Sequence, residues 1–466
     1  MKSSRQFSTR VSLSLASMAM LANTSMTAAQ SAPATPTDAQ EVPTATADLE
    51  GADPRFATHG FVSPGFDDRL LGDLYGSRRA LADLGLDVEL LATTDLSASS
   101  GGMEDFQTGQ YLLDLSITFD LGTAKLLDGG TIFADLQYWN WFGDSPLGVG
   151  DYWGWDVMNP VLGDEIFQLS ELWWQQKLGD SGVTATVGKI DSNRFFAIVP
   201  NAGPFLHVAD TEPATMLGYL PTYPNPAFGA MVQWQFGGSE PTDTKWLAQA
   251  GIFDGSSAAY NTSTGSNGPR TGNRGLSNMF DGGTFVIADF GPTWNLGTDG
   301  WRGNATVGAW MQIGETIRST AVGTKVVDDS GGLYFTITQD LHDADDSATR
   351  FELFSQTGWS DPSKVQAEWS TAAGVICRSP FAARPDDCAG FMAGVTLFSD
   401  DPLVYTAPGS TATGGNEGIF ELFYRFQLDR GIVLQPDVQY ISSPGGGDPS
   451  AVDGAFIATL RVEVAF

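Results

Sequence analysis

A nine-residue stretch, SELWWQQKL at 170–178, combines acidic, aromatic and amide side chains. Because successive side chains of an extended strand point to opposite faces, Glu171, Trp173 and Gln175 would share one face. An aromatic ring can contact the apolar side of a ring-shaped solute, while carboxylate and amide groups hydrogen-bond its hydroxyls weakly enough to release it again. The pattern therefore favours reversible binding of a polar solute such as a sugar.

Charged and polar groups continue in the next segment, TVGKIDSNRFF at 186–196. Alternation places Lys189 and Asp191 on one face, and Asn193 and Arg194 follow directly. We interpret these four residues as further candidates for contact with the same solute.

A second set of charged residues lies further along the chain, on segments with the same alternation. It consists of Arg350, Glu352, Glu421, Arg425, Asp437, Arg461 and Glu463. Opposite charges across a pore would produce a transverse field that orients polar solutes and slows ions. The alternative interpretation is that these charges form ordinary ion pairs between neighbouring strands.

The elements that must position these residues are β-strands. From residue 86 onward the chain consists of segments of roughly ten residues that alternate apolar and polar side chains and are separated by turn formers. The alternation predicts sixteen strands, near residues 86–96, 110–121, 131–142, 167–178, 183–190, 228–236, 245–253, 284–296, 302–313, 331–338, 350–358, 367–377, 388–398, 418–428, 432–441 and 455–466.

An even number of amphipathic strands, the last of which ends the chain, predicts an all-β fold, a transmembrane antiparallel β-barrel of about 16 strands. The polar strand faces carry Asp, Gln, Arg and Glu, which suit a water-filled lumen, so the apolar faces are assigned to lipid. Closure would pair the final strand, ATLRVEVAF, with the first, so that no open edge faces lipid.

One long connection shows no strand pattern. Residues 195–228 are rich in proline, and long connections of this kind are usually functional or disordered. We predict that this segment folds into the barrel and narrows the pore, with an external surface loop as the alternative.

The N-terminal part of the chain has the composition of an export signal followed by a linker. A cationic start precedes the apolar stretch VSLSLASMAMLA, which is too short to span a bilayer and is followed by small residues. Leucines at helical spacing predict a short amphipathic helix within 68–85. The predicted organisation is a signal peptide at 1–29, a flexible Pro/Thr/Ala-rich segment at 30–55, an N-terminal segment with the helix at 56–85, and the barrel at 86–466.

The charge balance excludes several function classes. With 55 acidic against 24 basic residues, the chain lacks the clustered cations that nucleic acid binding requires. The acidic loops are interpreted as solvated, and binding of divalent cations to them is left open. No nucleophile elbow, zinc-protease motif or phosphate-binding loop occurs, so we predict no enzyme activity, no catalytic residue, no metal site and no cofactor.

The two cysteines, Cys377 and Cys388, lie near the facing ends of two predicted strands. In an exported protein such a spacing favours a disulfide that links the hairpin, with free thiols as the alternative.

In these patterns the sequence resembles the carbohydrate-selective porins of the OprB type. The resemblance rests on an ordered series of segments: LLGDLYGSRRALADLGLDVEL, ELWWQQKLGDSGVTATVGKIDSNRFFA, GWSDPSKVQAEWSTAAGVI, RPDDCAGFMAGV and FELFYRFQLDRGIVLQPDVQYISSPGG. It implies a bacterial outer-membrane barrel of sixteen strands that conducts sugars by passive diffusion. The C-terminal Phe466 is similar to the signal by which the barrel assembly machinery recognises such proteins.

Two alternatives remain open at this stage. One is a porin of the same fold that conducts inorganic ions or other small nutrients. The other is a secreted carbohydrate-binding or carbohydrate-hydrolysing β-protein. The sequence also leaves open which sugar passes, and whether the protein is a monomer or a trimer.

Overall fold

The computed structural model describes residues 69–158, 165–238, 243–255, 260–261, 266–267, 283–296, 301–342, 349–408, 410–447 and 452–466. The predicted signal peptide and the flexible segment after it lie outside these ranges. Within the described chain, no helix is long and apolar enough to cross a bilayer.

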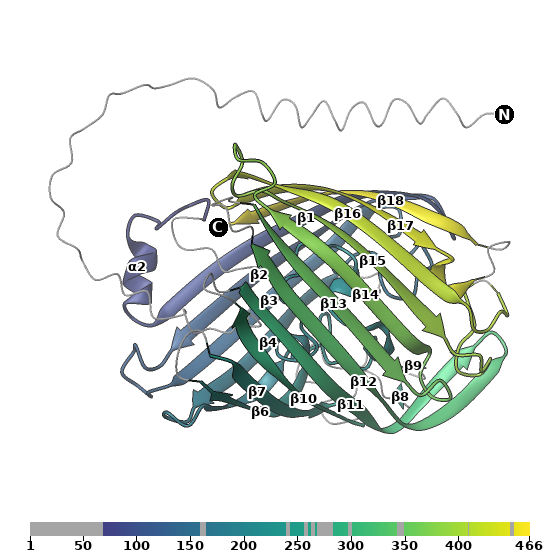
Figure 1. The fold of residues 1–466 in the computed structure, drawn as a ribbon, viewed down its shortest axis with the longest axis horizontal. Helices are drawn as coiled ribbons and strands as arrows, with labels where there is room; N and C mark the ends of the chain where they lie inside the picture. The colour runs from purple at the N-terminus through teal and green to yellow at the C-terminus, as the bar shows by residue number, and fades with distance from the viewer. Residues whose placement is uncertain are drawn as a thin grey trace. The chain divides into compact units, whose positions relative to one another are not determined.

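Antiparallel strands form one closed barrel, in which each strand pairs with its neighbours in the chain (Figure 1). The sixteen barrel strands are β1 (Leu86–Gly102), β2 (Phe106–Asp120), β3 (Gly130–Gly143), β4 (Ile166–Lys177), β5 (Val183–Ile190), β6 (Ala227–Gly237), β7 (Lys245–Asp254), β10 (Thr284–Leu296), β11 (Trp301–Thr320), β12 (Gly323–His342), β13 (Arg350–Ser360), β14 (Ala367–Arg378), β15 (Cys388–Phe398), β16 (Asn416–Asp429), β17 (Ile432–Ser442) and β18 (Asp453–Ala465). The predicted fold class and number of strands are confirmed. A separate two-stranded sheet consists of β8 (Tyr260–Asn261) and β9 (Ser266–Asn267).

The seam between β1 and β18 closes the barrel. The register runs from Leu91 opposite Ala465 to Ala98 opposite Ala458 without interruption. The backbone N–H of Phe466 also donates to the carbonyl of Leu90, at 2.8 Å. The last residue of the chain is therefore held in the hydrogen-bond ladder, as expected for a barrel without open edges.

Alternating side chains give the wall an apolar outer face and a largely polar inner face. On the outer face, Phe167, Val307, Leu422 and Phe456 are each at least half exposed. On the inner face, Asp95, Gln110, Glu171, Gln435 and Arg461 are buried inside the barrel. Because lipid cannot hydrogen-bond backbone groups, a closed barrel with this outer face is a membrane-spanning structure.

The N-terminal segment is less helical than predicted. The helix α2 covers only Ser77–Ala82, and residues 69–76 form turns. The backbone at Leu74 and Tyr75 has positive φ angles of 48° and 59°, and that of Gly76 has a φ of 88°. A right-handed helix cannot continue through these conformations, so leucine spacing alone overestimated its length.

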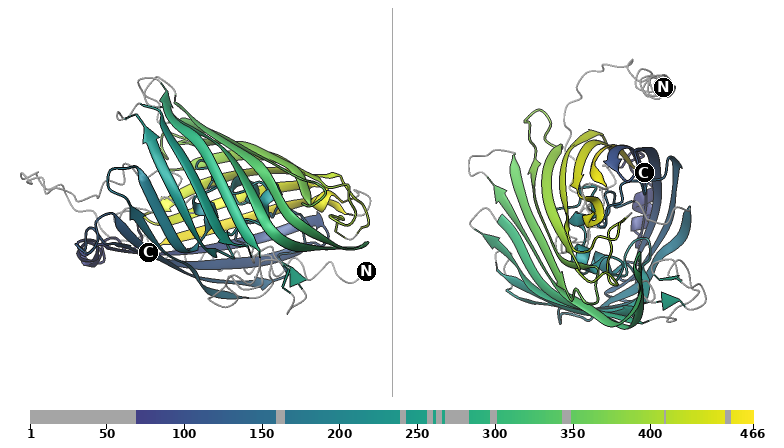
Figure 2. Two further views of the ribbon diagram at one scale, coloured as in Figure 1. Left: turned by 90° about the horizontal axis from the view of Figure 1, so that it is seen from below. Right: turned by 90° about the vertical axis from the view of Figure 1, so that its right-hand side faces the viewer.

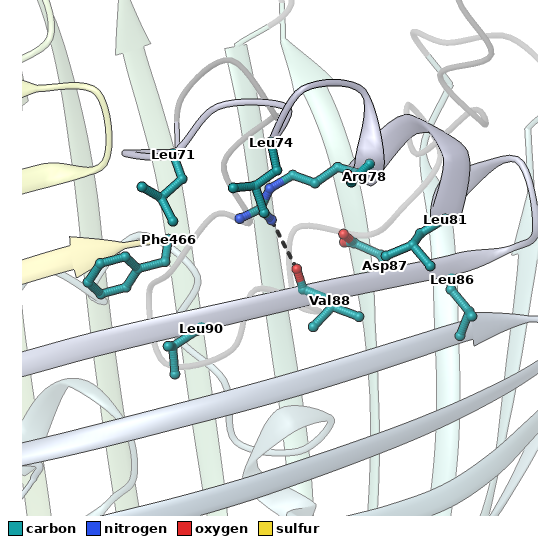
Figure 3. Close-up of a pocket in the computed structure, with 10 residues that line it drawn as sticks. Leu71, Leu74, Arg78, Leu81, Leu86, Asp87, Val88, Leu90 and Phe466 are labelled. Atoms are coloured by element: carbon teal, nitrogen blue, oxygen red, sulfur yellow. Dashed lines mark hydrogen bonds between the residues drawn. The ribbon is translucent and has the colours of Figure 1, made fainter.

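This segment packs against residues 86–90 of β1, beside the end of the chain (Figure 3). Leu71, Leu74 and Leu81 line a cavity of about 270 Å³ together with Val88 and Phe466. The remaining lining residues are Ser77, Arg78, Leu86, Asp87 and Leu90, and an Arg78 guanidinium nitrogen donates to the Val88 carbonyl at 3.1 Å. Both termini of the described chain therefore meet at one rim of the barrel.

The predicted disulfide between Cys377 and Cys388 is wrong, because both cysteines are free. In the β14–β15 register Cys377 lies opposite Ala389, and Cys388 lies opposite Arg378. Since neighbouring residues on a strand face opposite sides, the two thiols point away from each other across the wall, and no bridge can form without moving the backbone.

We therefore expect the denatured protein to accept two maleimide labels without prior reduction, one on each free cysteine. Mass spectrometry of the labelled chain, purified without reductant, would measure this. If the protein takes up label only after reduction, the two cysteines form a disulfide and the prediction of free thiols is wrong.

Candidate functional site

Two connections between strands fold back into the barrel. The first inner segment, residues 144–158, follows β3, and the second inner segment, residues 191–226, links β5 to β6. Viewed along the barrel, short helices of the second segment lie inside the ring of strands (Figure 2). These are η5 (Ser192–Arg194), η6 (Val208–Asp210) and η7 (Ala214–Met216). The predicted inward folding of this connection is confirmed.

Carboxylates of the wall bind the backbone of both segments. The buried Glu421 of β16 accepts the N–H groups of Leu206 and His207, at 2.5 and 3.1 Å. Four residues earlier on the same strand, Glu417 accepts the N–H groups of residues 152–153, at 2.7 and 3.1 Å. Amide groups inside a barrel lack access to the strand ladder, so these carboxylates supply the partners that burial requires.

Wall amides bind the carbonyl groups of the second inner segment. Gln435 of β17 donates to the carbonyl of Pro204 at 2.7 Å, and Gln249 of β7 donates to that of Phe195 at 2.6 Å. β7 and β17 lie far apart around the barrel. The segment is therefore fixed across the lumen, not to one side of it.

Apolar side chains of the second segment fill part of the interior. Phe205 packs edge-on against Phe354 and Phe423 of the wall, with ring centroids 5.5 and 4.9 Å away. A Cβ atom at Gly390 would come within 3.0 Å of the Phe205 ring, so the glycine provides the space for this contact. The lumen is thus narrowed by a packed apolar core as well as by charges.

The buried His207 belongs to this packing and is uncharged. Burial lowers the pKa of His207 to about 3, because the surroundings cannot solvate the cation. Its Nδ1 atom therefore accepts the N–H of Ala209, at 3.1 Å.

The first predicted cluster forms where the second segment leaves the wall. Arg194 binds the carboxylate of Glu171 through its Nε atom, at 3.1 Å from Oε1, and through Nη2. The indole N–H of Trp173 donates to the same carboxylate at 3.0 Å, and so does the backbone N–H of Asp191, also at 3.0 Å. Glu171 is therefore saturated with donors, while Arg194 keeps 12% of its side chain exposed.

Aromatic rings surround this ion pair. Phe133 and Trp173 stack with their ring centroids 4.9 Å apart, and the guanidinium carbon of Arg194 lies 4.6 Å from the centroid of Phe133. Phe195 meets Trp173 edge-on at 6.2 Å. The cluster thus combines flat apolar faces with a partly accessible cation in a restricted interior.

Three other predicted residues near this cluster are buried and form hydrogen bonds with backbone groups. Lys189 donates to the carbonyl of Leu169 at 2.8 Å, and Asp191 accepts the N–H of Tyr223 at 3.1 Å. The amide of Asn193 donates to two carbonyl groups within the second segment. Gln175 lies further along β4 and donates to the hydroxyl of Thr186 at 3.2 Å. The contacts of Asp191 and Asn193 hold the second inner segment in place, whereas those of Lys189 and Gln175 join β4 to β5.

The second predicted set is arranged along the inner face from β13 to β18. Register places Arg350 opposite Arg378, Arg378 opposite Cys388, and Cys388 opposite Arg425. The carboxylate of Glu352 neutralises Arg378, at 3.0 Å. Arginines therefore line this side of the wall.

Further pairs continue this row to the seam. Arg425 binds Glu463, and Arg461 binds Asp95 across the seam at 2.6 Å. Arg461 also lies 3.5 Å from Asp156 of the first inner segment. Opposite charges therefore meet side by side on the wall.

Two predicted residues, Glu421 and Asp437, lie buried beside the inner segments. Asp437 accepts from Gln439 at 3.3 Å, with 2% of its surface exposed. Prediction from the sequence missed four partners, Asp95, Asp156, Arg378 and Glu417. Among the described residues, no three His, Cys, Asp or Glu side chains gather as metal ligands.

Comparison with known families and proteins identifies the relatives of this chain. Residues 106–466 match the carbohydrate-selective porin, OprB family. Porin B of Pseudomonas aeruginosa is 21% identical in an alignment of 449 positions that covers 85% of this chain and 91% of that protein. A putative porin, QuiX, of Acinetobacter baylyi is 22% identical in an alignment of 325 positions that covers 65% of this chain and 70% of that protein.

Solved structures show the same fold. The high-pH structure of Pseudomonas putida OprB has a TM-score of 0.71 at 19% identity, and the alignment covers 87% of this chain and all of that one (100%). The low-pH structure of that protein has a TM-score of 0.52 at 14% identity and covers 86% of this chain and 98% of the other.

Proposed function

Because this chain belongs to the carbohydrate-selective porin, OprB family, and is a porin of the bacterial outer membrane, we propose that sugars cross its lumen past the Glu171–Arg194 cluster. The arginine pairs of the wall from β13 to β18 line the same passage. Transport is passive and involves no chemical conversion of the solute. Small sugars are the partners of the interior, and membrane lipid is the partner of the outer face.

The observation that supports this proposal is the geometry around Arg194. The exposed part of Arg194 offers donors for the hydroxyls of a sugar. The stacked rings of Phe133 and Trp173, each 8% exposed, form the apolar support on which the guanidinium lies. The carboxylate of Glu171 fixes the guanidinium in position. Such a site binds weakly enough for a solute to leave, as conduction requires.

Replacing Arg194 by alanine is expected to weaken block of the ion current by glucose or maltose. Hydrogen bonds to a charged group contribute about 1.5–3 kcal/mol, so the half-blocking sugar concentration should rise about tenfold or more. Single-channel recording in planar bilayers measures this. Arg194→Lys should preserve part of the block, and Arg79→Ala, which alters an exposed arginine of α2, should preserve all of it.

If Arg194→Ala leaves block by sugar unchanged, Arg194 does not contact the sugar in the passage. If no sugar blocks the wild-type current at any concentration, the carbohydrate proposal itself fails, and ions or other small nutrients become the cargo.

We also propose that the barrel assembly machinery recognises the last strand before closure. In the closed barrel the Phe466 N–H is bound to Leu90 and its ring packs beside Leu71 (Figure 3). Recognition of this strand would therefore precede its pairing with β1.

A further inference from the structure

Arg318 differs from the other arginines inside the barrel. It lies near the end of β11, on the same face as the buried Thr316, and its guanidinium carbon is 4.9 Å from the centroid of the Tyr219 ring. Its Nε and Nη2 atoms are buried and have no hydrogen-bond partner among the described residues. The residue as a whole is half-buried.

Four other buried or half-buried arginines of the interior are neutralised by carboxylates. Arg194, Arg378, Arg425 and Arg461 each bind a glutamate or an aspartate. Lys325, opposite Arg318 in the register of β11 and β12, binds Asp401 at 2.8 Å. No described carboxylate forms an ion pair with Arg318.

A buried charge without a partner is unfavourable, and the face of one tyrosine ring offsets only part of the loss. Arginine stays protonated in such surroundings, so it cannot avoid the cost by releasing a proton. The unfavourable arrangement is relieved when an anionic oxygen reaches the guanidinium. The position is suitable, because β11 ends beside the second inner segment, where the Tyr219 ring lies against Arg318.

We propose that Arg318 forms a subsite for an anionic group carried by a sugar, either a carboxylate or a phosphate. The inference rests on the proposed function and narrows its substrate class to include sugar acids and sugar phosphates. The interior contains many buried carboxylates, including Glu417, Glu421 and Asp437, which would otherwise disfavour an anion. Because these carboxylates repel an anion, we attribute any preference for an anionic sugar to the positive charge of Arg318.

The test is block of single-channel current by three probes of similar size: glucose, glucuronate and glucose 6-phosphate. In the wild-type protein, a charge-assisted bond to Arg318 should lower the half-blocking concentration of at least one anionic probe about tenfold below that of glucose. The two anionic probes distinguish a carboxylate subsite from a phosphate subsite. In Arg318→Gln this preference should vanish, while block by glucose stays the same.

Two controls make the outcome decisive. Arg318→Lys keeps the charge and should retain part of the preference, and Arg79→Gln in the exposed part of α2 should retain all of it. A change in gel mobility on heating reports whether each variant is folded. Equal block by glucose and both anions in the wild type, or an anion preference that survives in Arg318→Gln, would overturn the subsite. Absence of block by any sugar would instead refute the proposed function.

Discussion

Replacing Glu421 by alanine is expected to open the channel. The change removes the acceptor of two backbone N–H groups, those of Leu206 and His207, at the centre of the second inner segment. Each bond to the carboxylate contributes about 1.5–3 kcal/mol, so docking of the segment should weaken by about 3–6 kcal/mol, a shift of more than a hundredfold in its docked population. Release of the segment would widen the lumen, raise single-channel conductance and abolish block by sugar.

The matched controls separate loss of the anchor from loss of charge. Glu421→Gln keeps an acceptor oxygen and should give an intermediate conductance. Glu104→Ala removes a glutamate side chain that is exposed in the connection between β1 and β2, and should leave conductance as it is. A folded Glu421→Ala protein with wild-type conductance and sugar block would show that the segment holds without this carboxylate.

Replacing Arg461 by alanine is expected to destabilise the barrel by about 3–5 kcal/mol. Arg461 of β18 binds Asp95 of β1 through Nε and Nη2, at 2.8 and 2.6 Å, and contacts Asp156 of the first inner segment. Asp95 and Asp156 are 0% and 1% exposed, so the substitution would leave two buried carboxylates without their cation. The affected contact joins the first and last strands.

Urea unfolding of the protein in lipid vesicles would measure this loss. Arg461→Lys keeps the charge but not the paired hydrogen bonds, and should lose less stability. Arg79→Ala removes an arginine that is 66% exposed and should change stability by less than about 1 kcal/mol. Similar stability of Arg461→Ala and the wild type would mean that water or other groups compensate the two aspartates.

The strands were predictable because each carries its own alternation. The pattern failed mainly where Gly and Asp interrupt it. The prediction ended one strand at residue 313 and began the next at 331, whereas β11 and β12 continue to Thr320 and from Gly323. A register shift after Gln312, with Gly314 at a φ of 108°, lets the ladder continue through residues that resemble a turn.

The contacts of the candidate site were only partly predictable. Glu171 and Arg194 lie on consecutive segments of the chain, and strand alternation placed Glu171 on the inner face. Both residues were therefore predicted to contact the same solute. The partners Asp95 and Arg461 are separated by almost the whole barrel, and only the closed seam brings them together. For Glu421 the sequence predicted the inward face, but it contains no signal that a loop backbone, and not a solute, would bind the carboxylate.

The way in which the inner segments are held has a consequence for the order of biogenesis. Their contacts reach β2 near the start of the barrel, β7 near the middle of the chain, and β16, β17 and β18 at its end. A partly folded barrel that contains only the strands of the first half of the chain lacks the wall residues that bind these segments. The narrow part of the passage is therefore the last region to acquire its final form, and a barrel halted before its final hairpin would leak.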